Sequence, residues 1–115
     1  MNIVCGGVAR EWKKWYICHM FIAIVSYKKP LDEVDRHLGA HRAFLTRHYE
    51  AGDVITSGPQ TPRRGGVIML RAESRSHALA ILAEDPFNIN GIADYEVVEF
   101  TPTKFCDPGL EPFLK

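Results

Sequence analysis

Two short apolar runs constrain the fold of this chain more than any other feature. They occupy residues 20–27 and 67–70, and both are rich in β-branched, aromatic or other large apolar residues typical of strands. A strand in an antiparallel sheet with one wet face alternates apolar and polar residues, and neither run alternates. We therefore expect both faces of the central sheet to be covered.

The segments between and after these runs predict the remaining elements. Val34, Leu38 and Leu45 recur at helical spacing, and Gly52 is a suitable helix stop. Gly65-Gly66 is expected to open the second apolar strand. The expected elements are a strand over residues 20–27, a helix over 31–51, strands over 53–58 and 67–70, a helix from Ser74 or Ser76 to residue 83, and a strand over 92–100.

The order βαββαβ predicts an α+β fold of the ferredoxin-like type, in which both helices cover one face of a four-stranded antiparallel sheet. Two helices leave the opposite face uncovered, although the central strands are apolar on both faces. This predicts a homodimer in which two sheets pack face to face and form a barrel-like centre.

The length of 115 residues predicts a single domain. Composition shifts at Met20, so the folded domain is expected over residues 20–104, with a C-terminal tail over 105–115. Residues 1–19 are expected to be a disordered extension or a start-site artefact. The alternative is a genuine arm whose Trp12 and Trp15 dock on a neighbour.

The charge balance excludes several partners. Lys and Arg number 14, Asp and Glu number 14, and no long run of like charge appears, so the basic face that nucleic acid requires is not expected. Arg63-Arg64 is expected to form a solvated hairpin tip. We expect a small-molecule or protein partner, and neither nucleic acid nor a membrane.

Cysteine usage and apolar runs predict the compartment. The three cysteines form no Cys-x-x-Cys pair, which favours a reducing environment. No stretch approaches the roughly 20 apolar residues of a membrane helix. Charged residues from Arg10 to Lys14 interrupt any signal-peptide core. A cytoplasmic location is therefore expected.

His41 is the first candidate functional residue. It lies three residues after Leu38 and four before Leu45, so its ring is aimed inward, where neighbours alter its acid–base chemistry. Asp85 is the second, because Pro86 is expected to end the preceding helix and leave Asp85 at its exit. The two are a candidate acid/base pair. The alternatives are a buried neutral histidine bonded to a carbonyl, and an aspartate that starts a turn by bonding local amides.

Other motifs are weaker. His37, His41 and His48 share one side of the expected helix, and paired histidines bind zinc, but no third ligand is evident and a metal site is not favoured. No cofactor is expected, since the chain lacks a Walker loop and a dinucleotide fingerprint. Residues 57–59, Ser-Gly-Pro, are expected to form a turn whose amides receive an anionic or carbonyl group. No Ser-His-Asp context accompanies Ser57.

Five motifs occur in a recognisable order. They are His-Arg-Ala-Phe-Leu at residues 41–45, Ala-Gly at 51–52 leading to Ser-Gly-Pro at 57–59, Gly-Gly-Val-Ile at 65–68, Ala-Glu-Asp-Pro-Phe at 83–87, and Val-Glu-Phe-Thr-Pro at 98–102. Together they resemble the YciI-like (YCII-related) family of small bacterial proteins over residues 20–104. The resemblance implies a dimeric α+β barrel and an active site that falls on His41 and Asp85. Many members carry an arginine where this chain has Leu38, so no arginine role is carried over, although Arg36 and Arg42 lie nearby.

The sequence thus predicts a small cofactor-independent enzyme of the isomerase or lyase type. His41 is expected to be the general acid or base, and Asp85 to hold its tautomer. Backbone amides near Gly58 are expected to stabilise an oxyanion. The residues expected to bind substrate are Gly58, Pro59, Phe44 and Phe87. The alternative is a non-catalytic ligand-binding or dimerisation module in which His41 and Asp85 form a structural pair.

Overall fold

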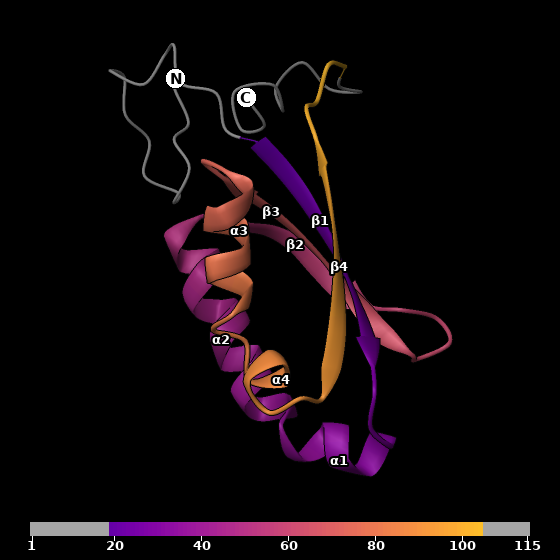
Figure 1. The fold of residues 1–115 in the computed structure, drawn as a ribbon. Helices are drawn as coiled ribbons and strands as arrows, with labels where there is room; N and C mark the ends of the chain where they lie inside the picture. The colour runs from indigo at the N-terminus through magenta and orange to yellow at the C-terminus, as the bar shows by residue number, and fades with distance from the viewer. Residues whose placement is uncertain (1–18, 105–115) are drawn as a thin grey trace.

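The computed structural model describes residues 19–104. The predictions for residues 1–18, including Trp12 and Trp15, and for the tail over 105–115 lie outside this range. His19, assigned above to the N-terminal extension, is the first residue of the first strand. The elements shown in Figure 1 are β1 (His19–Tyr27), α1 (Leu31–Arg36), α2 (Leu38–Ala51), β2 (Val54–Pro59), β3 (Gly65–Ala72), α3 (Arg75–Leu82), α4 (Pro86–Ile89) and β4 (Ala93–Phe100).

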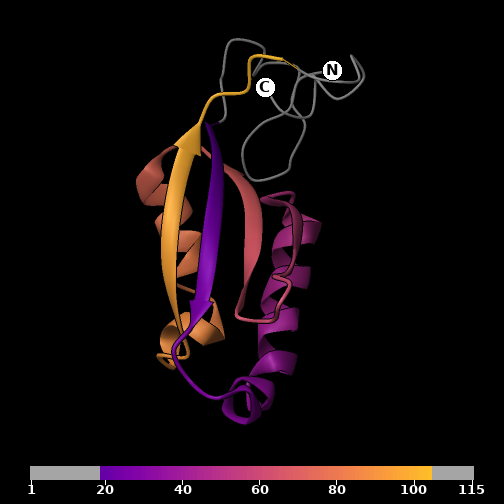
Figure 2. The same cartoon turned by 90° about the vertical axis from the view of Figure 1, so that its right-hand side faces the viewer.

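The strands form one antiparallel sheet in the order β2-β3-β1-β4. Helices α2, α3 and α4 lie on one side of it (Figure 1). In the turned view, the strands stand in front and the helices lie behind or beside them (Figure 2). This is the ferredoxin-like arrangement of the dimeric α+β barrel fold, so the predicted fold class is confirmed. Within the described residues, no helix has the length and apolar character needed to cross a membrane.

Strand β1 shows why the sheet is apolar on both faces. Phe21, Ala23 and Val25 are buried against the helices as part of the core. The alternate residues Ile22 and Ile24 point to the other face, because successive side chains of a strand point in opposite directions. No helix within residues 19–104 covers that face (Figure 1), and the register continues it onto both neighbouring strands. Its further apolar members are Val67, Met69 and Val98, cross-strand partners of Ile24 or Ile22.

The expected single helix over residues 31–51 is in fact two helices. His37, with φ −103° and ψ 1°, ends α1 and also precedes α2. The four-residue step from Val34 to Leu38 fits a continuous helix and a break at this residue equally well, so the apolar spacing did not reveal it. Gly52 ends α2 in the left-handed conformation, with φ 82°, as predicted.

Pro86 begins a helix, whereas the sequence indicated that it ends one. Helix α3 stops at Leu82, and Pro86 is the first residue of α4, with Asp85 as its N-cap. Proline suits this position because its φ is already helical and its missing N–H has no partner to lose. The N-cap of α3 is Ser74, whose side chain accepts a hydrogen bond from His77 N.

Residues 57–59 also differ from expectation, because they lie in strand β2 and form no turn. Gly58 pairs with Val67, and Pro59 pairs with Gly66. Pro59 is tolerated because β2 is an edge strand and Pro59 is its last residue. Gly65 is required at the start of β3, where a Cβ would lie 1.7 Å from the carbonyl oxygen of Val25. This close approach joins the two central strands, β3 and β1, at the end of the sheet where the candidate site lies.

Candidate functional site

His41 and Asp85 lie 44 positions apart in sequence and are brought together by α2 and the N-terminus of α4. Nδ1 of His41 is 2.8 Å from Oδ1 of Asp85. The His41 side chain is 14% exposed and the Asp85 side chain is fully buried. The carboxylate therefore lies behind the ring, and only the histidine reaches solvent.

The Asp85 carboxylate accepts three hydrogen bonds. Oδ1 accepts from His41 Nδ1 and from the backbone N–H of Phe87 at 3.0 Å, while Oδ2 accepts from the Tyr95 hydroxyl at 2.5 Å. The bond to Phe87 is the N-cap interaction that the turn interpretation of Asp85 predicted. The same carboxylate thus caps a helix and orients a histidine.

Tyr95 is a residue that the sequence interpretation missed. Burial, followed by its hydrogen bond to Asp85, raises the pKa of its phenol well above the ordinary value. The hydroxyl therefore remains a donor at neutral pH. Its position in β4 was accessible in principle, because Ala93, Tyr95 and Val97 alternate toward the core.

The hydrogen bonds and packing fix the tautomer and the plane of the His41 ring. A carboxylate has no proton to donate, so Nδ1 of His41 donates to Asp85, and Nε2 carries the free lone pair of the neutral ring. Within residues 19–104 no group hydrogen-bonds Nε2. The ring stacks on Phe87, with centroids 4.1 Å apart and planes 7° apart. Phe44 lies at 6.2 Å on a second side.

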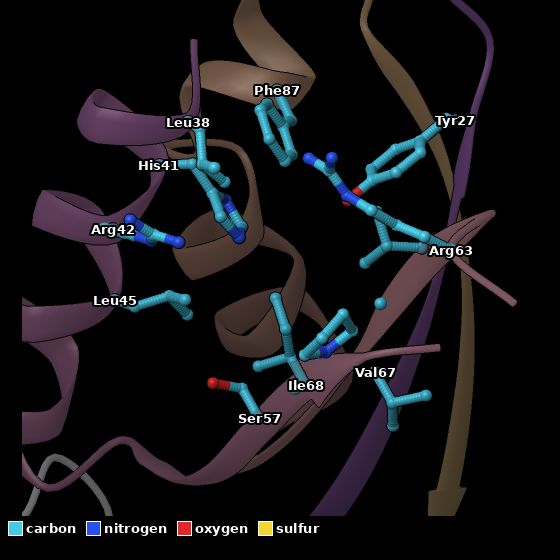
Figure 3. A pocket seen from close by; sticks show the side chains of 14 residues that line it. Tyr27, Leu38, His41, Arg42, Leu45, Ser57, Arg63, Val67, Ile68 and Phe87 are labelled. Carbon is cyan, nitrogen blue, oxygen red and sulfur yellow. The ribbon is translucent and has the colours of Figure 1, made fainter. Parts of the chain in front are cut away.

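A pocket of about 390 Å³ opens beside this ring, between α2 and the β2–β3 edge of the sheet (Figure 3). Four of the predicted site residues line it: His41, Gly58, Pro59 and Phe87. Asp85 does not, since it lies behind His41. Phe44 does not line it either; it is fully buried and contacts His41 and His48 from the core side. The expectation that Phe44 forms part of the pocket surface is therefore wrong. Phe44 supports the histidine ring from the core side.

Polar lining residues were underestimated from the sequence. Arg63, expected at a solvated hairpin tip, lines the pocket, bonds Asp35 at 2.6 Å and lies 5.8 Å from the centre of the Tyr27 ring. Ser57 lines the opposite side, and its hydroxyl is 2.6 Å from that of Tyr49. The apolar surface comes from both layers. It includes Leu38, Leu45, Val25 and Ile68, with Arg42 beside them.

His48 is a second histidine of α2 with carboxylate partners, but it lies outside the pocket. Its Nδ1 is 2.7 Å from Asp53 and its Nε2 is 2.9 Å from Glu84, so both nitrogens are occupied. His37 and His41 do not form a metal site with it. Among the residues from 19 to 104, no group of three or more His, Cys, Asp or Glu is arranged to hold a metal ion.

The fold and the site together define a small ferredoxin-like α+β protein that places a histidine–carboxylate pair beside a pocket of small-molecule size. Comparison with known proteins agrees with this class. Residues 20–101 match the YCII-related domain, and the chain belongs to that family, which confirms the resemblance drawn from the sequence motifs.

A solved structure supports the fold independently. It is the 5-chloro-2-hydroxyhydroquinone dehydrochlorinase of Burkholderia phenoliruptrix AC1100, in complex with 2,5-dihydroxybenzoquinone. The two chains superpose with a TM-score of 0.62 at 18% sequence identity, over 70% of this chain and 92% of the other. No curated protein matches the chain. At this identity the likeness shows the fold and leaves the chemistry to be argued from the site.

Proposed function

We propose that this protein is an enzyme that transfers a proton on a small organic molecule, in an isomerisation or an elimination. The observation that carries the proposal is the orientation of His41. Its Nδ1 is held by a buried carboxylate, and its Nε2 is left free at a pocket of about 390 Å³. This is the arrangement of a positioned general base with an orienting partner.

The proposed step uses only groups of this chain and the substrate. His41 Nε2 takes a proton from a substrate carbon, and the Asp85 carboxylate stabilises the resulting imidazolium through Nδ1–H. In an isomerisation the imidazolium returns the proton to another atom of the substrate. In an elimination the C–H electron pair forms a double bond, the leaving group departs with its own electron pair, and the proton passes from His41 to solvent.

The edge strand β2 contributes surface to the proposed site. Gly58 lines the pocket, but it pairs with Val67, and the bond from Gln60 N to the Gly65 carbonyl two residues along sets the register so that the Gly58 N–H points to β3. The predicted oxyanion role of this amide is therefore not part of the proposal. Pro59, which has no N–H, contributes only surface. Phe87 has a double function, since it stacks on His41 and lines the pocket, so that it excludes water from one side of the ring. The structurally similar dehydrochlorinase, crystallised with a small quinone, supports a small ring-containing substrate.

The decisive experiment measures hydrogen–deuterium exchange at the acidic carbons of a panel of lactones, phenolics and organic acids, followed by NMR in D₂O. A substrate found with the wild-type protein is then tested with His41→Ala. A positioned base contributes about 10²–10⁴ in rate, so the variant is expected to lose exchange by that factor while it stays folded. Full exchange by folded His41→Ala would exclude the proposal.

Two further variants sharpen this test. In Asp85→Asn the side-chain amide can donate to Nδ1 and favour the other tautomer, so exchange is expected to fall although His41 is present. His48→Gln is the matched control. It removes a histidine on the same helix that also bonds a carboxylate but does not line the pocket. It is expected to lower thermal stability and to leave exchange unchanged.

A non-catalytic ligand-binding module is the second candidate function. It is favoured by the complete burial of Asp85 and by its three hydrogen bonds, which also fit a structural network. This candidate predicts that His41→Ala lowers the thermal stability and that no compound of the panel exchanges faster with wild-type protein than in buffer.

We further propose that two copies associate through the uncovered face of the sheet. Ile22, Ile24 and Met69 are half-buried on this face, and Val67 and Val98 are 38% and 44% exposed. A contiguous apolar sheet face of this kind is typical of an interface between sheets. Its test is given with the whole-molecule prediction in the Discussion.

A further inference from the structure

Two arginines, Arg42 and Arg63, line the pocket, and among the residues that the structure describes no acidic side chain lines it. Asp35 is paired with Arg63 and offsets its charge. The Asp85 carboxylate is fully buried behind His41, which separates it from the pocket. The positive charge available to a ligand is therefore that of Arg42, and a positive charge at a partly enclosed site attracts anions.

Arg42 differs from Arg63 in what it contacts. The guanidinium of Arg63 bonds Asp35 at 2.6 Å and lies over the Tyr27 ring. Within residues 19–104, the guanidinium of Arg42 makes no hydrogen bond or ion pair. Figure 3 shows it at the α2 side of the cavity, beside His41 and above Leu45. A guanidinium has five N–H donors in a planar fork that matches a carboxylate with two parallel hydrogen bonds.

The rest of the pocket is suited to an apolar body. Leu38, Leu45 and Ile68 line it between Arg42 and the sheet, and the flat face of Phe87 lies next to His41. A ligand that places an anionic group on Arg42 therefore extends its apolar part across these residues. Figure 3 shows the side chains of Arg42 and His41 beside each other at the same side of the cavity, so a carbon next to an anionic group bound by Arg42 lies near the His41 ring.

We propose that the ligand of this pocket is a small, flat carboxylic acid whose carboxylate is bound by Arg42. This inference deepens the proposed function, on which it rests for the identity of the site. Arg42 neutralises the charge that would otherwise oppose removal of a proton from an adjacent carbon.

The test uses benzoate and benzamide, which have the same size and differ in charge. Binding is measured by ¹H–¹⁵N chemical-shift titration at fixed pH and ionic strength. A hydrogen bond to a charged group contributes more than a neutral one, and wild-type protein is expected to bind benzoate about tenfold more tightly than benzamide. Shifts are expected at the amides of Arg42 and Gly58. Raising the salt concentration is expected to reduce the preference.

Matched variants assign the preference to one side chain. Arg42→Gln is expected to reduce it to near parity, and Arg42→Lys to keep part of it, because lysine retains the charge without the fork. Arg47→Gln is the control, since Arg47 is an exposed arginine of the same helix and does not line the pocket. It is expected to bind both compounds as the wild type does.

Several outcomes would overturn the proposal: no binding of benzoate, equal binding of benzoate and benzamide, or an equal loss in Arg42→Gln and Arg47→Gln. Tighter binding of 4-nitrophenolate, an anion without a carboxylate, than of benzoate would also overturn it.

Failure of the proposed function gives a different set of results. If wild-type protein prefers benzoate through Arg42 but exchanges no carbon-bound hydrogen, the carboxylate site stands and the proton-transfer function falls. If exchange depends on His41 but acids and amides react equally, the function stands and this inference falls.

Discussion

At the scale of single residues, Asp85 connects backbone structure to chemistry. It caps α4 through Phe87 N and holds His41 through the same oxygen, Oδ1. The pairing of His41 with Asp85 was predictable from the sequence. His41 lies on the apolar stripe of a helix, and Asp85 directly precedes a proline. The contact of the Tyr95 hydroxyl with Asp85 and the place of Arg42 beside the pocket were not predictable, since each depends on which elements meet in space rather than on local spacing.

The third donor to Asp85 makes a prediction about alkaline pH. The pKa of Tyr95 is raised in the folded protein, whereas in the unfolded chain it lies near the ordinary value of about 10. Above about pH 10 the unfolded chain loses this proton while the folded protein keeps it, so the free energy of unfolding falls as pH rises. The stabilisation from Tyr95 is therefore fully present below about pH 10 and is lost progressively above it.

Tyr95→Phe removes this titration and keeps the ring. We expect the wild type to be more stable than the variant at neutral pH, by about 1 kcal/mol for the lost hydrogen bond. The difference is expected to shrink as pH is raised above about 10. Urea denaturation of both proteins at a series of alkaline pH values measures it. A stability difference that stays constant across the series would show that the phenol of Tyr95 titrates normally.

At the scale of elements, the sequence predicted types and order better than boundaries. Runs of apolar and β-branched residues gave the central strands, and apolar residues at helical spacing gave the first helical segment, because both patterns follow from burial. They could not locate the break at His37, where the apolar side chains on both sides still face inward. They also could not show that Pro86 starts α4, because proline marks the end of one helix and the start of another equally well.

The β-strand glycines provide an element-scale prediction. A Cβ at Gly65 would lie 1.7 Å from the Val25 carbonyl oxygen, which belongs to the backbone of β1 and cannot move aside cheaply. A Cβ at Gly58 would have no atom within 4 Å. We expect Gly65→Ala to destabilise the protein by more than about 2 kcal/mol, and Gly58→Ala to change stability by less than about 0.5 kcal/mol.

Urea denaturation of the two glycine variants tests this contrast directly. Both substitutions change a strand glycine to alanine in neighbouring strands, β2 and β3, so the change in intrinsic strand propensity is the same for both. Equal stabilities would mean that β1 and β3 are not as closely spaced at Gly65 as the structure shows.

At the scale of the whole molecule, the sheet has two apolar faces, and the helices of the described part of the chain cover one of them (Figure 1). The sequence indicated this because apolar and polar residues do not alternate over residues 20–27 and 67–70. The register shows that Ile22, Met69 and Val98 share the uncovered face. The ferredoxin-like topology was predictable in the same way. An element covered on one side has one apolar face, and a central strand covered on both sides has two.

The proposed dimer is tested by placing a charge on that face. Val98 is 44% exposed on the uncovered side of β4, and Leu79 is 45% exposed on helix α3. Because the two side chains are equally exposed, a glutamate at either position has a similar effect on the folding of one chain. At Val98 it would be buried without a partner in the dimer, near Glu96 of the same face, and an unpaired buried charge is strongly unfavourable.

We expect wild type and Leu79→Glu to sediment as dimers and Val98→Glu to sediment as a monomer. Sedimentation equilibrium of the three proteins decides it, since a monomeric wild type, or a dimeric Val98→Glu variant, would show that the face is not the interface.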